Sequence, residues 1–273
     1  MLKRILQIIA GFILIILPFW PITENLFPPE AQVDNQTFSK YLLLCSIIIV
    51  VALGLVYFQK AQKTLAGWLF FAIGMAAIFP LHLGPPRENA ELLNFSYIEQ
   101  FRYGMLTVAI LLFFAGSFKA AAPVKTIISK VFIVFFIVAT LLNIWDNFSS
   151  FMFSTEMHKW VDSGKRADDF FTNYDYNMVW RTWARASLYA AAIWLSLLLV
   201  KQVEIRKWQF VILCIFNTIG ITFCSMSLLI DAQYYYPFMV PAIALAPSYW
   251  IGLMLLCKKT DLRIKTNAQQ ATL

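Results

Sequence analysis

The chain has 273 residues, of which 60% are hydrophobic and only 14% are charged. A soluble domain keeps roughly a quarter of its residues charged, so this composition is typical of a membrane protein and excludes an ordinary soluble enzyme. The formal net charge of +7 would suggest nucleic-acid binding in a soluble chain, but in so apolar a sequence we expect no nucleic-acid partner.

Eight apolar segments meet or approach the length of about 20 helical residues that crosses roughly 30 Å of hydrocarbon. In chain order they are residues 5–22, 41–59, 64–84, 101–118, 131–149, 182–200, 208–230 and 236–257. Their apolar runs are continuous and do not alternate, which excludes a closed barrel. We therefore predict an all-α, polytopic integral membrane helix bundle of about eight transmembrane helices. Residues 1–257 form its single domain, and residues 258–273 form a cytoplasmic tail.

The distribution of lysine and arginine predicts the orientation of the bundle. The connections on the side of the N-terminus hold fourteen of the 22 basic residues and only two acids, Glu204 and Asp261. The opposite side holds the other eight basic residues and thirteen of the fifteen acids. Because positively charged connections favour the cytoplasmic side, we expect both termini to lie in the cytoplasm. We expect the membrane to be the cell (inner) membrane.

Residues 150–181 form the largest predicted extracytoplasmic element. Met157, Trp160 and Val161 fall on one helical face, which predicts a short amphipathic helix that ends at Gly164. Two interpretations stay open for this helix: an ordinary cover over the bundle, or a lid over a functional site.

Charged residues near the outer ends of several segments share one predicted depth. Asp146 lies sixteen residues from Lys130, and Arg185 lies sixteen residues from Lys201, or about 24 Å along each helix. Arg102 lies at nearly the same distance from Lys119. All three therefore fall several Å inside the outer edge of a core about 30 Å thick. His82, Arg181 and Asp231 are expected at or just beyond that edge, which completes a predicted charged ring of these six residues.

Helical spacing indicates that the ring faces inward. Arg181 and Arg185 are four residues apart, and Asn143 and Asp146 are three apart, so each pair shares a face. On the seventh segment a stripe of small and polar side chains recurs toward the outer surface: Asn217, Gly220, Cys224, Ser227 and Asp231. Such a stripe is typical of a helix-packing surface, and the alternative is the wall of an outward groove. Asn147 heads a glycosylation sequon, to which we assign no functional weight.

We select as candidate ligand-binding residues the ring and its polar neighbours: His82, Arg102, Asn143, Asp146, Arg181, Arg185, Asn217 and Asp231. Three arginines against two aspartates leave an excess of positive charge, which favours a phosphate or carboxylate ligand. Asp146 or Asp231 is a candidate general base, and His82 or His158 a candidate general acid. The alternative is structural: arginines that reach lipid headgroups, and an Asp146–Arg185 pair that only joins two helices. No metal site or cofactor is expected.

The leading functional prediction is a multi-pass membrane protein whose outward-facing polar cavity binds an anionic lipid or a small anion in the outer leaflet. Group transfer to or from a lipid-linked substrate is a candidate reaction, although no motif establishes an enzyme. The first alternative is a non-catalytic integral subunit of a larger membrane complex, with other membrane subunits as partners. The second is a facilitative transporter, favoured by the stripe on the seventh segment and by Pro80 and Pro241.

Overall fold

A computed structural model shows an all-helical chain, and it describes residues 2–16, 35–58, 65–83, 96–121, 127–166, 169–170, 178–230 and 242–257. Over these residues eight long helices follow one another. They are α1 (Leu2–Ile16), α3 (Asn35–Phe58), α4 (Leu65–Leu83), α6 (Ser96–Ala121), α7 (Ile127–Asp162), α9 (Met178–Lys201), α10 (Lys207–Leu229) and α11 (Ala242–Cys257). The tail at 258–273 lies outside the described residues.

Each of the eight apolar segments predicted from the sequence overlaps one of these helices. Four stretches in the described part of the chain are long and apolar enough to cross a membrane: Phe38–Tyr57, Val131–Met152, Val179–Lys201 and Lys207–Leu229. Three other helices contain shorter apolar stretches, namely Leu65–Met75, Tyr103–Lys119 and Pro247–Cys257. The apolar helices are compatible with a membrane protein, while eight crossings and cytoplasmic termini stay predictions.

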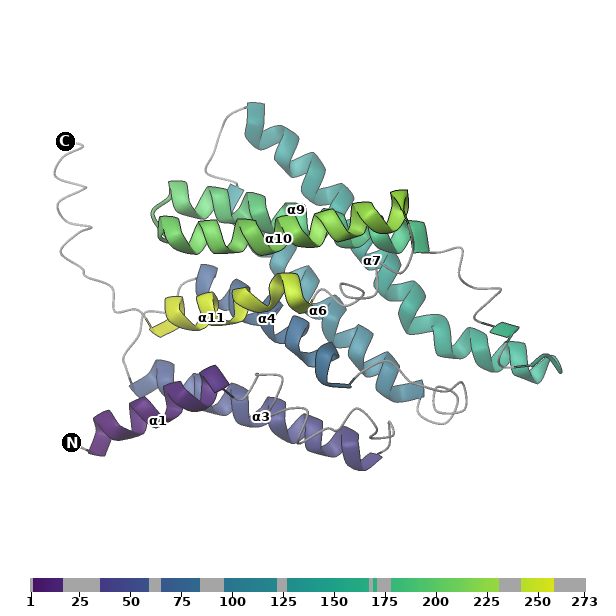
Figure 1. Cartoon of the computed structure of the whole chain (residues 1–273), viewed down its shortest axis with the longest axis horizontal. Coiled ribbons are helices and arrows are strands. Elements are labelled where there is room, and N and C mark those ends of the chain that lie inside the picture. Colours follow the sequence, from purple (N-terminus) through teal and green to yellow (C-terminus); the bar gives the residue numbers. More distant parts are fainter. Residues whose placement is uncertain are drawn as a thin grey trace.

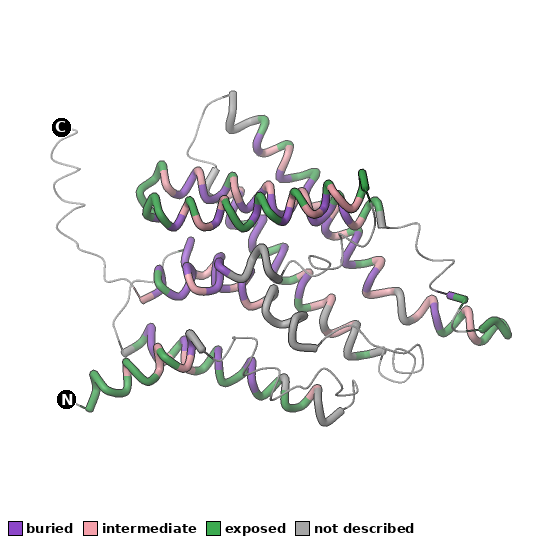
Figure 2. Tube along the Cα trace, in the orientation of Figure 1, coloured by how far each residue is buried: buried purple, intermediate pink, exposed green. Residues whose placement is uncertain are grey.

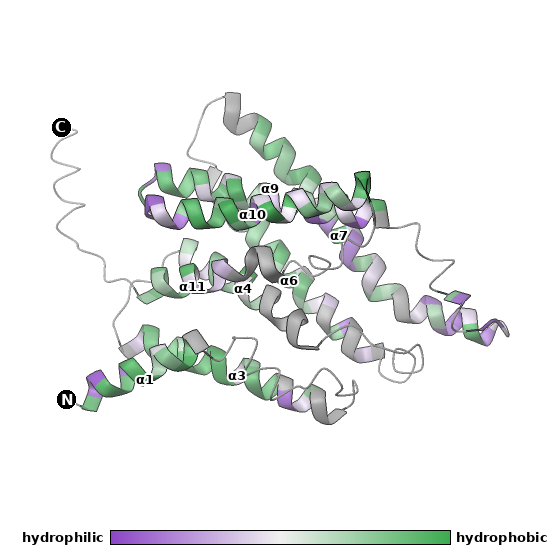
Figure 3. Cartoon of the chain, viewed as in Figure 1, coloured by the Kyte–Doolittle hydropathy of each residue, from purple (hydrophilic) through white to green (hydrophobic). Residues whose placement is uncertain are grey.

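The exposed faces of the helices are apolar. Figures 2 and 3 show that many of the exposed positions along α1, α3 and α10 are also hydrophobic ones. Examples are Leu6 and Phe12 on α1, Val50 on α3, and Val211 on α10. Water would disfavour so much exposed apolar surface, whereas lipid tails are as apolar as these side chains. The surface therefore agrees with the hydropathy of the sequence.

Helix α7 is longer than the sequence analysis predicted. The amphipathic helix expected within residues 150–181 is not separate, because residues 151–162 are the last turns of a continuous 36-residue helix. These residues include neither proline nor glycine, so nothing in the chain breaks the helix where it leaves the apolar segment. The helix ends at Asp162, two residues before Gly164, whose φ of 81° suits a glycine. Figure 1 shows these last turns projecting away from the other helices.

Helices α4 and α11 approach each other most closely. A Cβ added to Gly74 of α4 would overlap the backbone of Tyr249 of α11, and one added to Gly252 of α11 would overlap the backbone of Phe71. The Tyr249 hydroxyl donates a hydrogen bond to the carbonyl of Leu14, at 3.1 Å, and so joins α11 to α1. Small residues at such crossings allow close helix packing in membranes.

Helices α6, α7, α9 and α10 pack together in the part of the molecule away from α1 and α3. Figure 1 shows α9 and α10 lying side by side, with α1 and α3 along the other edge. Helix α7 packs against both α6 and α9. Phe136 of α7 contacts the rings of Phe114 and Phe118 of α6, and Phe132 contacts Trp194 of α9. This packing turns one face of α7 toward its two neighbours.

Candidate functional site

A row of buried polar side chains occupies the face of α7 that is turned toward α6 and α9. Its members are Asn143, Asp146, Asn147 and Ser150, and each is at most 3% exposed. They stand at positions i, i+3, i+4 and i+7, which share one side of a helix. The row continues the buried side that Phe132, Phe136 and Ala139 occupy deeper in α7. A polar patch thus replaces the aromatic core toward the C-terminal half of the helix.

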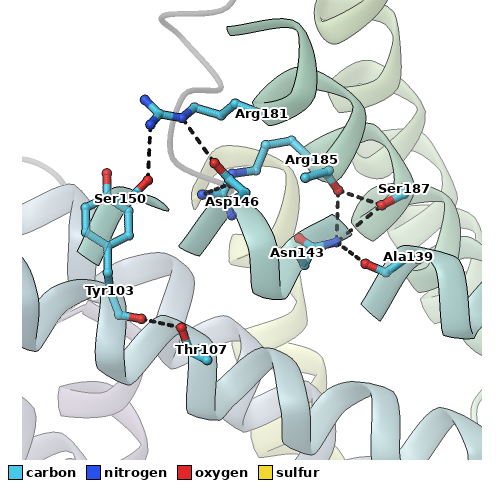
Figure 4. Close-up of polar contacts among 10 residues, drawn as sticks. Tyr103, Thr107, Ala139, Asn143, Asp146, Ser150, Arg181, Arg185 and Ser187 are labelled. Carbon is cyan, nitrogen blue, oxygen red and sulfur yellow. Dashed lines mark hydrogen bonds and ion pairs between the residues drawn. The ribbon is translucent and has the colours of Figure 1, made fainter. Parts of the chain in front are cut away.

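Asp146 forms ion pairs with two arginines of α9 (Figure 4). Its Oδ2 lies 2.9 Å from an Nη2 atom of Arg185, and its Oδ1 accepts a hydrogen bond from Nε of Arg181 at 3.1 Å. Because the two arginines are one helical turn apart, both guanidinium groups reach the same carboxylate. We call Asp146, Arg181 and Arg185 the charged cluster.

Burial differs between the two arginines. The side chains of Asp146 and Arg185 are each 2% exposed, whereas the side chain of Arg181 is 22% exposed. Ionised side chains are almost never so completely buried unless they are paired. The Asp146–Arg185 pair therefore forms the inner part of the charged cluster, and Arg181 forms its accessible part.

Ser150 extends the charged cluster toward α6. Its Oγ accepts a hydrogen bond at 3.1 Å from Nη2 of Arg181, which thereby bridges Asp146 and Ser150. In the view of Figure 4 the ring of Tyr103 of α6 is directed toward Ser150. The contacts of the charged cluster itself join α7 to α9.

Asn143, which precedes Asp146 by about one turn of α7, joins α7 to α9. Its Nδ2 donates to the carbonyl of Ala139 in its own helix at 2.8 Å, and to the carbonyl of Ala184 in α9 at 3.0 Å. It also lies 3.2 Å from Oγ of Ser187. These contacts hold the two helices in register, so the carboxylate and the guanidinium groups meet.

The charged cluster carries one more positive than negative charge, because two guanidinium groups share one carboxylate. In surroundings of low dielectric constant such an excess attracts an anion more strongly than it would in water. Arginine also presents a planar fork of donors that matches phosphate and carboxylate oxygens. The arrangement can therefore bind an anionic group.

The structure brings together four of the eight residues selected from the sequence: Asn143, Asp146, Arg181 and Arg185. The side chains of His82 and Arg102, and the whole of Asp231, lie outside the described residues. His158 is exposed and lies twelve residues beyond Asp146 on α7, or about 18 Å along the axis, so α7 does not bring it to the charged cluster.

Asn217 belongs to the inward face of α10. It is fully buried, as are Gly220 and Cys224 of the predicted stripe, and its Nδ2 donates to the carbonyl of Leu213 at 2.7 Å. The described part of the stripe therefore faces the packed interior beside α9.

Sequence reasoning missed Ser150 and Asn147 as members of the site. Ser150 was grouped with a loop because hydropathy declines at that point, and Asn147 was considered only as part of a sequon. The spacing of four polar residues at i, i+3, i+4 and i+7 was the signal that identifies both, since it marks one helical face.

No protein-family model, no curated protein and no solved structure matches this chain.

Proposed function

We propose that this chain is an integral membrane protein that binds an anionic lipid headgroup or a small anion at the charged cluster. The observation that carries the proposal is the pairing of two arginines with one buried carboxylate, which leaves a positive charge in excess. The proposal places the charged cluster near the extracytoplasmic surface, in an outward-facing cavity of the outer leaflet.

The position of Arg181 supports this location. Counted from Lys201 at about 1.5 Å per residue, Arg185 lies about 24 Å and Arg181 about 30 Å along α9. A hydrocarbon core about 30 Å thick would then end close to Arg181. A guanidinium at that level meets lipid phosphates and dissolved anions, whereas the buried Asp146–Arg185 pair holds it in place.

The contacts of Asp146 favour binding over proton transfer by this carboxylate. Both of its oxygens lie within ion-pair distance of a guanidinium group. A general base needs a free oxygen within reach of the proton that it removes. A group-transfer reaction at this site would therefore need a base other than Asp146.

Replacement of the accessible arginine tests the proposal. We expect Arg181→Gln to weaken binding of phosphatidylglycerol to the purified protein by about tenfold to a hundredfold, the range of one or two lost charge-assisted hydrogen bonds. Native mass spectrometry of the detergent-solubilised protein, titrated with phosphatidylglycerol and separately with inorganic phosphate, measures the loss and shows which source of anion binds.

The matched control is Lys207→Gln, because it removes one positive charge from an exposed position at the far end of the α9–α10 pair. It should leave binding unchanged. If the two variants weaken binding equally, or if the unmodified protein binds neither probe, the charged cluster only joins α7 to α9. That result would favour the alternative of a non-catalytic subunit in a larger membrane complex.

A further inference from the structure

Asn147 is a buried amide whose hydrogen-bonding capacity is unused within the part of the chain that the structure describes. The residue is 0% exposed, and neither its Nδ2 nor its Oδ1 has a hydrogen-bond partner among the described residues. Most buried polar groups in proteins are paired, and an exception in the middle of a polar row calls for an explanation. The residue immediately follows Asp146 of the charged cluster along α7.

The packing of α7 indicates the side on which Asn147 lies. Phe136 stands eleven residues before Asn147, which is close to three full turns, so the two residues share a side of α7. Phe136 packs on Phe114 and Phe118, which places that side against α6. Asn147 therefore faces α6, whereas Asp146 faces α9.

Ser150 lies between these two directions. It stands three residues after Asn147 on the same face, and its hydroxyl is bonded to Arg181. Side chains three apart on a helix have Cβ atoms about 5–6 Å apart. A small ligand that is held by Arg181 beside Ser150 is therefore about one helical turn from the amide of Asn147, which is 0% exposed in this structure.

The chemistry of the amide narrows the class of ligand. A side-chain amide offers both N–H donors and a carbonyl acceptor. A hydroxyl group satisfies both, because it donates one hydrogen bond and accepts others. A phosphodiester anion, which carries no P–OH group at neutral pH, accepts from the amide nitrogen but leaves the amide oxygen without a donor.

We propose that Asn147 recognises a hydroxyl group of the bound ligand, and that the ligand is a phosphate ester of a polyol. Its phosphate lies at the charged cluster and a hydroxyl of the polyol lies at Asn147. This inference rests on the proposed anion binding and specifies its substrate class. The polyol phosphate is either the headgroup of a lipid or a soluble metabolite, since both carry the same chemistry.

Two pairs of probes of equal ester type separate hydroxyl recognition from anion binding. Phosphatidylglycerol and phosphatidylmethanol are both phosphodiesters, and only the first carries glycerol hydroxyls. Glycerol 3-phosphate and methyl phosphate form the corresponding soluble pair. We expect the protein in phosphatidylcholine nanodiscs to prefer the glycerol member of one pair by about tenfold, the value of one net hydrogen bond.

The variant Asn147→Leu should abolish that preference and retain binding of the methyl probe. It should also leave the thermal stability of the ligand-free protein unchanged or higher, because an apolar side chain of similar shape replaces an unsatisfied amide. Asn147→Ala serves as a second variant that needs no extra space. The control Thr140→Val removes a hydroxyl from the same face of α7, where Thr140 already bonds to the carbonyl of Phe136, and should keep the preference.

The outcomes distinguish the two proposals. A preference in the lipid pair identifies a headgroup, and a preference in the soluble pair identifies a metabolite; either one supports the inference if both Asn147 variants lose it. Equal binding within both pairs, or a preference that survives in both variants, overturns the inference and leaves Asn147 beside an ordinary buried water. Anion binding that Arg181→Gln leaves as tight as in the unmodified protein refutes the proposed function itself, whatever the Asn147 variants do.

Discussion

The Asp146–Arg185 pair combines two charges that are individually costly to bury. Each side chain is 2% exposed, and the two oxygens of Asp146 are divided between Arg185 and Arg181. A buried ion pair of this kind stabilises the folded state little compared with apolar side chains in the same place. Removal of one partner, however, leaves the other charge buried and unpaired. The loss of one partner should therefore destabilise the protein much more than the loss of both, and this difference tests whether the pair is buried as the structure shows.

Asp146→Asn should lower the free energy of unfolding by about 3–5 kcal/mol, because it takes the carboxylate away from a buried guanidinium. The double variant Asp146→Leu/Arg185→Met should lose much less, since both charges leave together. Unfolding of the detergent-solubilised protein in increasing sodium dodecyl sulfate measures both. Equal losses in the single and the double variant would contradict the buried pairing.

At this scale the sequence predicted the charges and Asn143, but not Asn147 and Ser150. Counting the helical rise from Lys130 and Lys201 placed Asp146 and Arg185 at one depth, and they form an ion pair. Asn147 and Ser150 were not selected because, by hydropathy alone, uncharged polar residues are expected at the end of a membrane span. Their burial depends on how α7 is rotated against α6, which depends on aromatic packing between the two helices.

Helices α4 and α11 show that the sequence predicts where helices form but not which helices are in contact. Hydropathy located both, because an apolar stretch in lipid satisfies its backbone only as a helix. It did not predict that Gly74 and Tyr249 bring the two backbones together, since they are far apart in the chain. The sequence analysis also missed the continuity of α7 through residues 151–162, because it placed the end of the helix where the side chains become polar.

Gly74→Ala should destabilise the α4–α11 contact. The added methyl group would overlap backbone atoms of Tyr249, and overpacking of this kind costs about 1–3 kcal/mol. The higher helix propensity of alanine offsets at most about 1 kcal/mol of that loss. Thermal unfolding in detergent measures the net change.

Gly54→Ala on α3 is the matched control, because nothing lies within 4 Å of the Cβ that would be added there. It should leave stability unchanged or raise it by up to about 1 kcal/mol. A Gly74→Ala protein that unfolds at the same temperature as the Gly54→Ala protein would show that α4 and α11 are not so close.

For the whole molecule, the charge asymmetry of the connections predicts which ends of the helices face the cytoplasm. Single cysteines at Ser163, beyond α7, and at Gln202, between α9 and α10, test it in a background without the native cysteines. We expect a membrane-impermeant maleimide to label Ser163→Cys in intact cells, and Gln202→Cys only after permeabilisation. The reverse pattern would show that the bundle has the opposite orientation.

The length of α7 has a mechanical consequence. A helix of 36 residues is about 54 Å long, far more than the thickness of the hydrocarbon core. Asp162, at its end, lies sixteen residues or about 24 Å beyond Asp146 along one unbroken helix. This projecting end is a lever arm: a tilt of about 10° around Asp146 moves it by roughly 4 Å at that length. A force applied to the C-terminal end of α7 would therefore reach the buried carboxylate as a rotation of the helix.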